Sequence, residues 1–355
     1  MRLTSFSFFL FCAVLLLIYY RVSRENQWAV LLVGSCVFYL RAGIEYLFFL
    51  LFTIVTVYAA TMAMARNFAA RDSIWPQLEP AQRKALNTLI RGRNRVLLSL
   101  CLAANLALLF FCKVCLLGFF ENSPFAFLTL GLPLGISFYC FQSMGYVIDV
   151  YRETQKAETS ILKLSLFISY FPLLVQGPIC RYGDLAPKLQ SGHAYDSKQV
   201  SFGLQRMLWG YFKKLVIADR ISVAVTALRG PGSAGAAFGV LTLFYAVQIY
   251  GDFTGGIDIV LGLSQALGIS LPENFIRPFF SKSIAEYWRR WHISLGAWMK
   301  DCIFYPVSVS APMRRLGKAA RQKWPKFGKR LPVYIATIIT WLATGIWHGL
   351  TPNFI

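Results

Sequence analysis

The sequence predicts an all-α polytopic membrane protein, a helical bundle in which broken helices surround an internal passage. Three observations predict this fold class. Hydrophobic residues make up 56% of the 355 residues and charged residues only 15%, well below the roughly 25% of a soluble domain. The apolar residues gather into runs long enough to cross a bilayer. Two of those runs are interrupted by proline and glycine, and such breaks are tolerated in membranes only inside protein or beside a water-filled cavity.

The apolar runs define the predicted membrane helices. In chain order they cover residues 5–20, 28–43, 44–64, 96–120, 125–148, 160–178, 202–219, 237–268 and 331–349. The first run lacks the small-x-small cleavage site of a signal peptide and is followed directly by Arg21 and Arg24, so we predict a retained membrane helix. The interrupted runs contain Gly131-Leu-Pro-Leu-Gly135 and Phe171-Pro-Leu-Leu-Val-Gln-Gly-Pro178.

The excess of basic residues is explained by membrane topology. The formal net charge is +20, but no nucleic-acid-binding motif accompanies it, so we exclude nucleic acid as a partner. Two basic loops, Arg66–Arg95 and Arg314–Arg330, are predicted to lie on the cytoplasmic side of the cell membrane, against anionic lipid. We interpret both as solvated charge runs without a catalytic role. Counting back from the first loop places the N-terminus outside.

Cysteines and acidic residues give few specific signals. Cys112-Lys-Val-Cys115 lacks the βαβ context of a redox motif, and no Cys/His group has the spacing of a metal site. In the run 237–268, Asp252 and Asp258 are predicted to line a polar cavity or to cap a helix break. Gly262 and Ala266 have the small-xxx-small spacing that lets two helices approach closely.

An amphipathic interfacial helix is predicted over residues 283–301. Ser283 followed by Glu286 forms a capping box that starts a helix. A single apolar stripe is formed by Ile284, Trp288, Trp291, Leu295 and Trp298, and its three tryptophans suit a helix at the headgroup boundary. Within this helix, His292 falls on the shoulder between the apolar and polar faces.

The chain contains three histidines, and one stands out. His348 lies in a run without Asp, Glu, Lys or Arg from Leu331 to Ile355, where an ionisable group is a functional candidate by default. Such an imidazole is expected to be sheltered from lipid and to adjoin a cavity. A solvated His292 and a structural His348 are the alternatives to a catalytic pair, and His193 is predicted to be a loop residue.

Four sequence stretches carry a family resemblance. They are residues 132–151, residues 170–181, residues 272–295 with the run Tyr287-Trp-Arg-Arg-Trp-His292, and Thr344-Gly-Ile-Trp-His-Gly349. Together they resemble the membrane-bound O-acyltransferase family, and the likeness runs from about residue 38 to residue 349. The resemblance implies a single membrane-embedded domain over 1–355, with helices around a tunnel. It also implies transfer of an acyl group from a thioester to a hydroxyl. Because family members continue through further membrane helices, it implies that C-terminal helices are missing here.

The resemblance also implies roles for individual residues. His348 corresponds to the family histidine and is expected to act as general base, because a neutral imidazole can take the proton of an attacking hydroxyl. His292 is expected to orient that imidazole or to bind substrate. Weaker candidates for lining the tunnel are Arg289, Arg290, Trp291, Asp301, Asp252 and Trp347. No bound cofactor is expected; the acyl donor is acetyl-CoA or a carrier-bound thioester.

Within the family, the run ending at His292 looks more like the alginate-type O-acetyltransferase branch than the branch that transfers D-alanine to teichoic acid. The expected acceptor is therefore a glycan hydroxyl, reached directly or through a partner acetyltransferase. The oligomeric state stays open. Two other hypotheses remain: a transporter or flippase that uses Asp252 and Asp258, and an inactive scaffold for glycan-modifying proteins.

Overall fold

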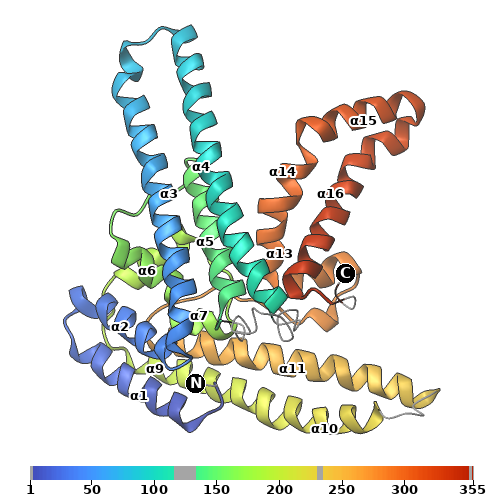
Figure 1. Ribbon diagram of the computed structural model, residues 1–355. Helices are drawn as coiled ribbons and strands as arrows, with labels where there is room; N and C mark the ends of the chain where they lie inside the picture. Colours follow the sequence, from blue (N-terminus) through green and yellow to red (C-terminus); the bar gives the residue numbers. More distant parts are fainter. Residues whose placement is uncertain (1–2, 116–132, 230–234, 352–353, 355) are drawn as a thin grey trace, which may run out of the picture. The chain divides into compact units, whose positions relative to one another are not determined.

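The computed structural model describes residues 3–115, 133–229, 235–351 and 354 (Figure 1). The described residues are 82% helical and contain no strand. Among the residues that the structure describes, four helices are long and apolar enough to cross a membrane: Ile44–Gln77, Pro80–Cys115, Ala236–Ala266 and Pro325–His348. Shorter apolar helices cover Phe6–Arg21 and Ile161–Gln176. The predicted class, an all-α multi-pass membrane protein, is therefore confirmed.

The chain divides into two compact units, each built from two separate segments. Unit 1 comprises Met1–Ile54 and Ser160–Phe275, and unit 2 comprises Val55–Thr159 and Ile276–Ile355. The long helix α3 (Leu47–Ile74) begins in the first unit and continues in the second.

Unit 1 contains the long helix α11 and most of the shorter helices. They are α1 (Phe6–Arg21), α2 (Gln27–Leu40), α6 (Ile161–Ser169), α7 (Phe171–Gln176), α8 (Tyr182–Gln190), α9 (Ser197–Tyr211), α10 (Asp219–Leu228) and α11 (Ala236–Ala266). A π-helical segment, Phe212–Ala218, joins α9 to α10. The pair α9–α10 runs alongside α11 (Figure 1).

The predicted break in the run 160–178 is confirmed, because α6 and α7 are separated at Tyr170. Pro172 occupies the first turn of α7, where a missing backbone N–H costs nothing. The N–H of Phe171 donates to the hydroxyl of Ser35 on α2 at 3.2 Å. The broken backbone is thus satisfied inside protein, as a membrane environment requires.

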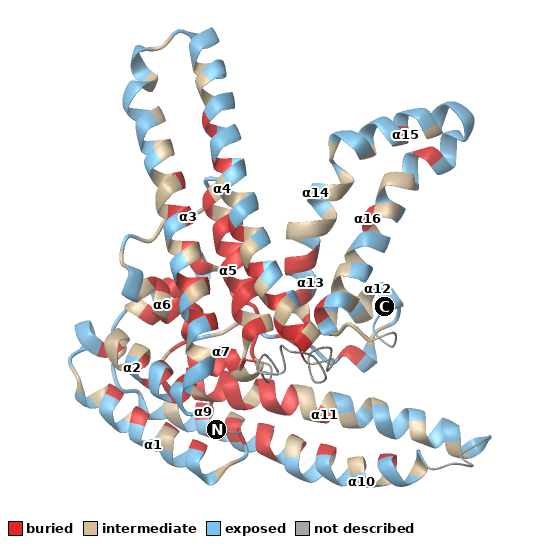
Figure 2. Cartoon of the chain, viewed as in Figure 1, coloured by how far each residue is buried: buried red, intermediate tan, exposed pale blue. Residues whose placement is uncertain are grey.

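Unit 2 contains two long helical hairpins and a set of short helices. The hairpins are α3 with α4 (Pro80–Cys115), and α15 (Ala311–Lys323) with α16 (Pro325–His348). Between them in sequence lie α5 (Ile136–Tyr151), α12 (Ile284–Arg290), α13 (Ile293–Met299) and α14 (Tyr305–Ser308). Figure 2 shows that the buried residues of this unit gather along α5, whereas α15 is mostly exposed.

The prediction that residues 66–95 and 314–330 are loops is wrong, because both segments are mainly helical. Arg, Lys, Ala, Leu and Gln are good helix formers, so the helices continue past the apolar runs. Pro80 begins α4, and the hydroxyl of Ser310 caps α15 by accepting from Met313 N–H at 3.4 Å. The charges therefore lie on helical hairpins rather than on irregular chain.

The run 125–148 is described only in part. Gly131 lies outside the described residues, while Gly135 adopts a left-handed backbone with φ of 72° and caps α5. That conformation is one that glycine adopts without penalty, so Gly135 fixes the start of the helix.

Candidate active site

His292 lies at a break between two helices, where the sequence predicted one. Ser283 caps α12 as expected, by accepting from Glu286 N–H at 3.2 Å, while the Glu286 carboxylate accepts from Lys282 N–H at 2.8 Å. His292 itself has φ of 45° and ψ of 53°, and its carbonyl accepts from Gly296 N–H at 3.1 Å to begin α13. The prediction of a continuous helix over 283–301 is therefore wrong.

The break changes which side chains can be buried. In one continuous helix, Ile284 and Trp298 would share a face. Instead Ile284 is 77% exposed and Trp298 only 6% exposed, because the turn at His292 points α13 into the interior of unit 2. The packing of α13 inside unit 2 therefore outweighs the periodicity that predicted one continuous helix over residues 283–301.

The ring of His292 is buried rather than on a solvated shoulder, with 4% of the residue exposed. Burial, with a smaller contribution from nearby His348, lowers the pKa of His292 to about 3. This residue lies outside the spanning helices and is a neutral imidazole at physiological pH. It is therefore suited to positioning or hydrogen bonding rather than to carrying charge.

His348 forms the C-terminal end of α16 and is exposed, contrary to the expected shelter. Its ring lies 4.7 Å from the Trp347 ring, edge to face, and is stacked with Phe354 at 6.1 Å. The helix ends immediately afterwards, and Gly349 N–H donates to the carbonyl of Gly345 at 3.0 Å. His348 is thus exposed at the end of the helix.

Three aromatic side chains, which we call the aromatic scaffold, connect the two histidine-bearing segments: Phe141, Trp298 and Trp347. Phe141 of α5 stacks on Trp298 of α13 with ring centroids 4.1 Å apart, and lies 5.5 Å from Trp347 of α16. Trp347 in turn meets the His292 ring edge to face at 6.2 Å. The scaffold therefore brings His292 and the residue adjacent to His348 together.

Two hydrogen bonds fix the orientation of the scaffold. The indole N–H of Trp298 donates to the carbonyl of Phe141 at 2.9 Å, and that of Trp347 donates to the carbonyl of Ser137 at 3.3 Å. Buried indole groups need such partners, so each tryptophan has a defined position against α5. Trp347, predicted as a tunnel residue, is thus a packing residue between the two histidines.

Lys113 is a site residue that the sequence analysis missed. It lies in the last turn of α4, is 9% exposed, and donates from Nζ to the carbonyl of Trp347. That carbonyl belongs to the last turn of α16 and has no partner within its own helix. The sequence does contain a signal for this residue. Lys113 is the one charged residue between Val96 and Phe120, and a charge within an apolar run is a functional candidate.

The remaining predicted residues of the 283–301 segment make other contacts. Arg289 is exposed, and Arg290 pairs with Glu286 at 2.5 Å. Trp291 stacks on Tyr287 with ring centroids 5.7 Å apart. The side-chain carboxylate of Asp301 accepts from Arg152 at 3.1 Å. These contacts stabilise the short helices around His292.

Asp252 and Asp258 lie in unit 1, where both are paired with basic side chains. Asp258 accepts from Arg206 at 3.0 Å and pairs with Lys213, and Asp252 pairs with Lys214. Arg206 also holds Glu273 through two hydrogen bonds of 2.7 Å. The carboxylates are thus neutralised within their own unit, whereas both candidate histidines belong to unit 2.

The described residues contain no group of three or more His, Cys, Asp or Glu side chains placed to hold a metal ion. All eight cysteines are free thiols, and Cys112 and Cys115 are both buried.

Comparisons with known proteins found one family model and several relatives. The model of the membrane-bound O-acyltransferase family matches residues 153–320, which include His292 but not His348. A probable alginate O-acetylase of Pseudomonas syringae pv. tomato is 32% identical over 98% of this chain and 62% of its own length. A peptidoglycan O-acetyltransferase of Helicobacter pylori is 30% identical over 68% of this chain and 51% of its own length.

A teichoic acid D-alanyltransferase of Bacillus subtilis is a further relative, 29% identical over 62% of this chain and 55% of its own length. The chain thus spans 62% of the length of the alginate O-acetylase that it matches across nearly all of its own residues.

Proposed function

Because residues 153–320 belong to the membrane-bound O-acyltransferase family, we propose that the chain is a membrane-embedded O-acyltransferase. It transfers an acetyl group from a thioester to hydroxyls of a cell-surface or extracellular polysaccharide. The names of the relatives support this choice, since an alginate O-acetylase and a peptidoglycan O-acetyltransferase both act on polysaccharides. The observation that carries the proposal is the aromatic scaffold, which places His292 beside Trp347 and so next to His348.

His348 is the general base in this proposal. It is exposed at a helix end, so an acceptor hydroxyl can reach its ring. The imidazole takes the hydroxyl proton while the oxygen attacks the thioester carbonyl and forms a tetrahedral intermediate. The carbon–sulfur bond then breaks, and the leaving thiolate recovers the proton from the imidazolium, which gives an ester and a free thiol.

Lys113 and His292 support this chemistry in different ways. The ammonium of Lys113 holds the carbonyl next to His348 in place and supplies positive charge for the oxyanion of the intermediate. His292 is neutral and buried, so it positions Trp347 and the end of α16 rather than exchanging protons. Arg289, Arg290, Trp291 and Asp301 are proposed to line the approach for substrate.

The acyl donor is proposed to be acetyl-CoA or a carrier-bound acyl thioester, and the site of action the cytoplasmic membrane. A D-alanyl donor is the alternative within the family, since a teichoic acid D-alanyltransferase is among the relatives. Incubation of the membrane-inserted protein with each labelled thioester, followed by mass spectrometry of the glycan, separates these donors.

The general-base role is tested by His348→Ala in the full-length protein inserted in membranes, with glycan acetylation as the readout. We expect acetylation to fall about 10²- to 10⁴-fold, the usual range for a lost general base. The matched control is His193→Gln, because His193 lies in a loop of unit 1, where its backbone N–H donates to Gln27 at 2.7 Å. Unchanged acetylation in a stably inserted His348→Ala protein would end the assignment.

A further inference from the structure

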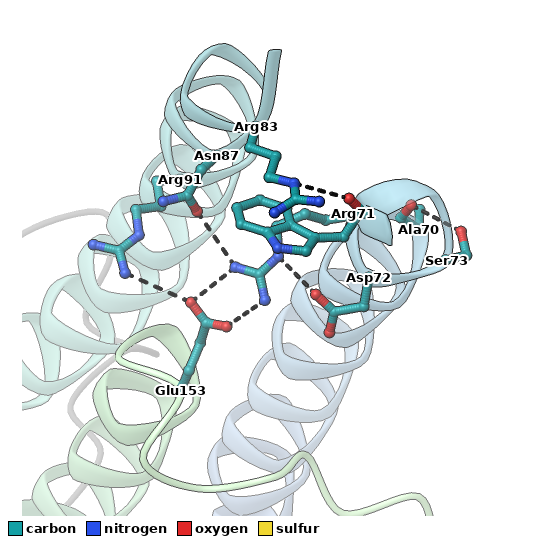
Figure 3. Close-up of polar contacts among 9 residues, drawn as sticks. Ala70, Arg71, Asp72, Ser73, Arg83, Asn87, Arg91 and Glu153 are labelled. Atoms are coloured by element: carbon teal, nitrogen blue, oxygen red, sulfur yellow. Dashed lines mark hydrogen bonds and ion pairs between the residues drawn. The ribbon is translucent and has the colours of Figure 1, made fainter. Parts of the chain in front are cut away.

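The α3–α4 hairpin carries a pocket that the proposed transfer chemistry does not use. It has a volume of about 450 Å³ and lies in unit 2 where the two helices meet (Figure 3). Its lining residues are Arg71, Asp72, Trp75, Pro76, Asn87 and Arg91. This volume falls within the range of small-ligand sites, roughly 300–1,000 Å³.

Arg71 forms the fixed wall of the pocket. Its side chain is 12% exposed, and its guanidinium donates to Asp72 at 2.9 Å and to both carboxylate oxygens of Glu153, at 3.1 and 2.6 Å. A further bond of 3.4 Å reaches the side chain of Asn87 (Figure 3). Since all three nitrogens of this guanidinium already donate hydrogen bonds, Arg71 shapes the pocket rather than binding a ligand directly.

Trp75 forms the second wall and lies near two cations. The guanidinium of Arg71 lies 5.8 Å from its ring, and that of Arg83 lies 5.9 Å away. Arg83 also donates to the backbone carbonyl of Trp75 at 3.1 Å. The indole is therefore fixed in place beside an excess of positive charge.

Arg91 is the side chain available to a ligand. It is 60% exposed and approaches Glu153 only to 3.7 Å, which is too long for a hydrogen bond. Its planar guanidinium can still donate two parallel hydrogen bonds to a phosphate. Over residues 66–95 there are seven basic side chains against two acidic ones, and Glu153 adds a third acid at the pocket, so the balance of charge still favours an anion.

The position of the pocket along the helices indicates the source of that anion. The apolar part of α3 ends at Arg66 and that of α4 begins after Arg95. At 1.5 Å per residue, Arg91 and Arg71 lie about 6 to 8 Å beyond these ends, and Trp75 about 14 Å. The headgroup layer on each side of a bilayer is roughly 5–8 Å thick, so both arginines lie at its depth.

We propose that this pocket binds the phosphate of an anionic phospholipid headgroup, with Arg91 as the hydrogen-bonding ligand, Arg71 as the fixed wall and Trp75 as the second wall, on the side of the pocket farther from the hydrocarbon core. The excess of basic side chains favours an anionic ligand, and the planar guanidinium of Arg91 favours a phosphate group. The depth of the two arginines in the headgroup layer favours a lipid phosphate over a soluble one. The site does not depend on the proposed transfer activity.

The test uses the full chain purified in a neutral detergent, with bound lipid counted by native mass spectrometry. The probes are phosphatidylglycerol, zwitterionic phosphatidylethanolamine and inorganic phosphate. We expect preferential binding of phosphatidylglycerol, and about a tenfold loss of its affinity in Arg91→Gln, the usual effect of losing a charged hydrogen bond. The matched control is Arg93→Gln, which is exposed on the same helix but does not line the pocket and should change affinity less than twofold.

A second variant keeps the test decisive if Arg91→Gln is unstable. Asp72→Asn removes a carboxylate of the pocket that is 63% exposed, so it should strengthen phosphatidylglycerol binding severalfold. Equal losses in Arg91→Gln and Arg93→Gln would overturn the proposal in favour of a diffuse basic surface. Competition by inorganic phosphate at concentrations equal to the lipid would overturn the lipid assignment, and equal binding of both lipids would do the same.

Discussion

His292 is held neutral by its surroundings, and this has a consequence for stability. The folded protein binds no proton at His292 until the pH falls toward about 3, because burial lowers the pKa of this group. In the unfolded chain the same imidazole has an ordinary pKa of about 6.5. Between these two values the unfolded state therefore binds more protons than the folded state.

The expected result is a loss of stability on acidification. The free energy of unfolding should be unaffected by His292 above pH 6.5 and should fall by up to about 1.4 kcal/mol per pH unit as the pH drops toward 3. Thermal unfolding of the detergent-solubilised protein between pH 7 and pH 4 measures this slope. His292→Gln should reduce the slope by that amount, and identical slopes for the two proteins would contradict the assignment.

At the scale of single residues, the sequence pointed to both histidines but not to their exposure. It predicted His292 on the shoulder of an amphipathic helix and a sheltered His348, whereas His292 is buried and His348 is exposed. His292 is buried because the chain turns at that residue and packs it beside Trp347, a contact 55 positions away that no local pattern reveals. His348 is exposed because α16 ends there. Lys113 could have been found, since a lone charge in an apolar run is unusual.

At the scale of elements, α9 and α11 pack at glycine contacts. A Cβ added to Gly262 would lie 2.5 Å from the carbonyl oxygen of Gly203 and 2.7 Å from the backbone nitrogen of Met207. One added to Gly210 would lie 2.6 Å from the carbonyl oxygen of Gly255. The close helix approach predicted from Gly262 and Ala266 is thus confirmed. The backbones of α9 and α11 are themselves in contact.

Substitution of Gly262 by alanine is expected to push α9 and α11 apart. Because the clashing atoms are backbone, they cannot rotate away, and overpacking of this kind costs about 1–3 kcal/mol. The matched control is Gly239→Ala on the same helix, where nothing lies within 4 Å of the added Cβ. That variant should be neutral or stabilising by up to about 1 kcal/mol through helix propensity.

Thermal unfolding of both variants in detergent measures the difference. A lower melting temperature for Gly262→Ala together with an unchanged or higher one for Gly239→Ala supports the tight crossing. Equal melting temperatures for the two variants would show that the helices are not held at backbone contact.

The sequence predicted where helices lie better than where they end. Within the described residues, the apolar runs correspond to helices because hydrophobic segments of that length have few other solutions in a membrane. The hairpin extensions at residues 66–95 and 314–330 were missed, since charge marks the end of an apolar run and not the end of a helix. The turn at His292 was missed because it depends on Phe141 and Trp298, which pack against each other far apart in sequence.

At the scale of the whole molecule, the two candidate functions rest on different units. The histidines and the aromatic scaffold lie in unit 2, while the acidic side chains that suggested a transporter lie in unit 1. Asp258 is 14% exposed and is held by Lys213 and Arg206, so it is a paired structural group. Removing one partner of such a buried pair typically costs about 3–5 kcal/mol, which makes Asp258 a poor test of function.

Asp252 separates acyl transfer from transport more cleanly, because its side chain is 48% exposed and its pairing with Lys214 contributes at most about 1 kcal/mol. For an acyltransferase, Asp252→Asn should keep acetyl transfer within about twofold, whereas the double variant His292→Gln/His348→Gln should lose it. Reconstituted vesicles containing each variant allow acetylation and substrate flux to be measured on the same preparation, with Lys214→Gln as the control for the lost ion pair. A flux that persists without both histidines and disappears in Asp252→Asn would instead establish a transporter, since transfer chemistry requires the imidazole and transport does not.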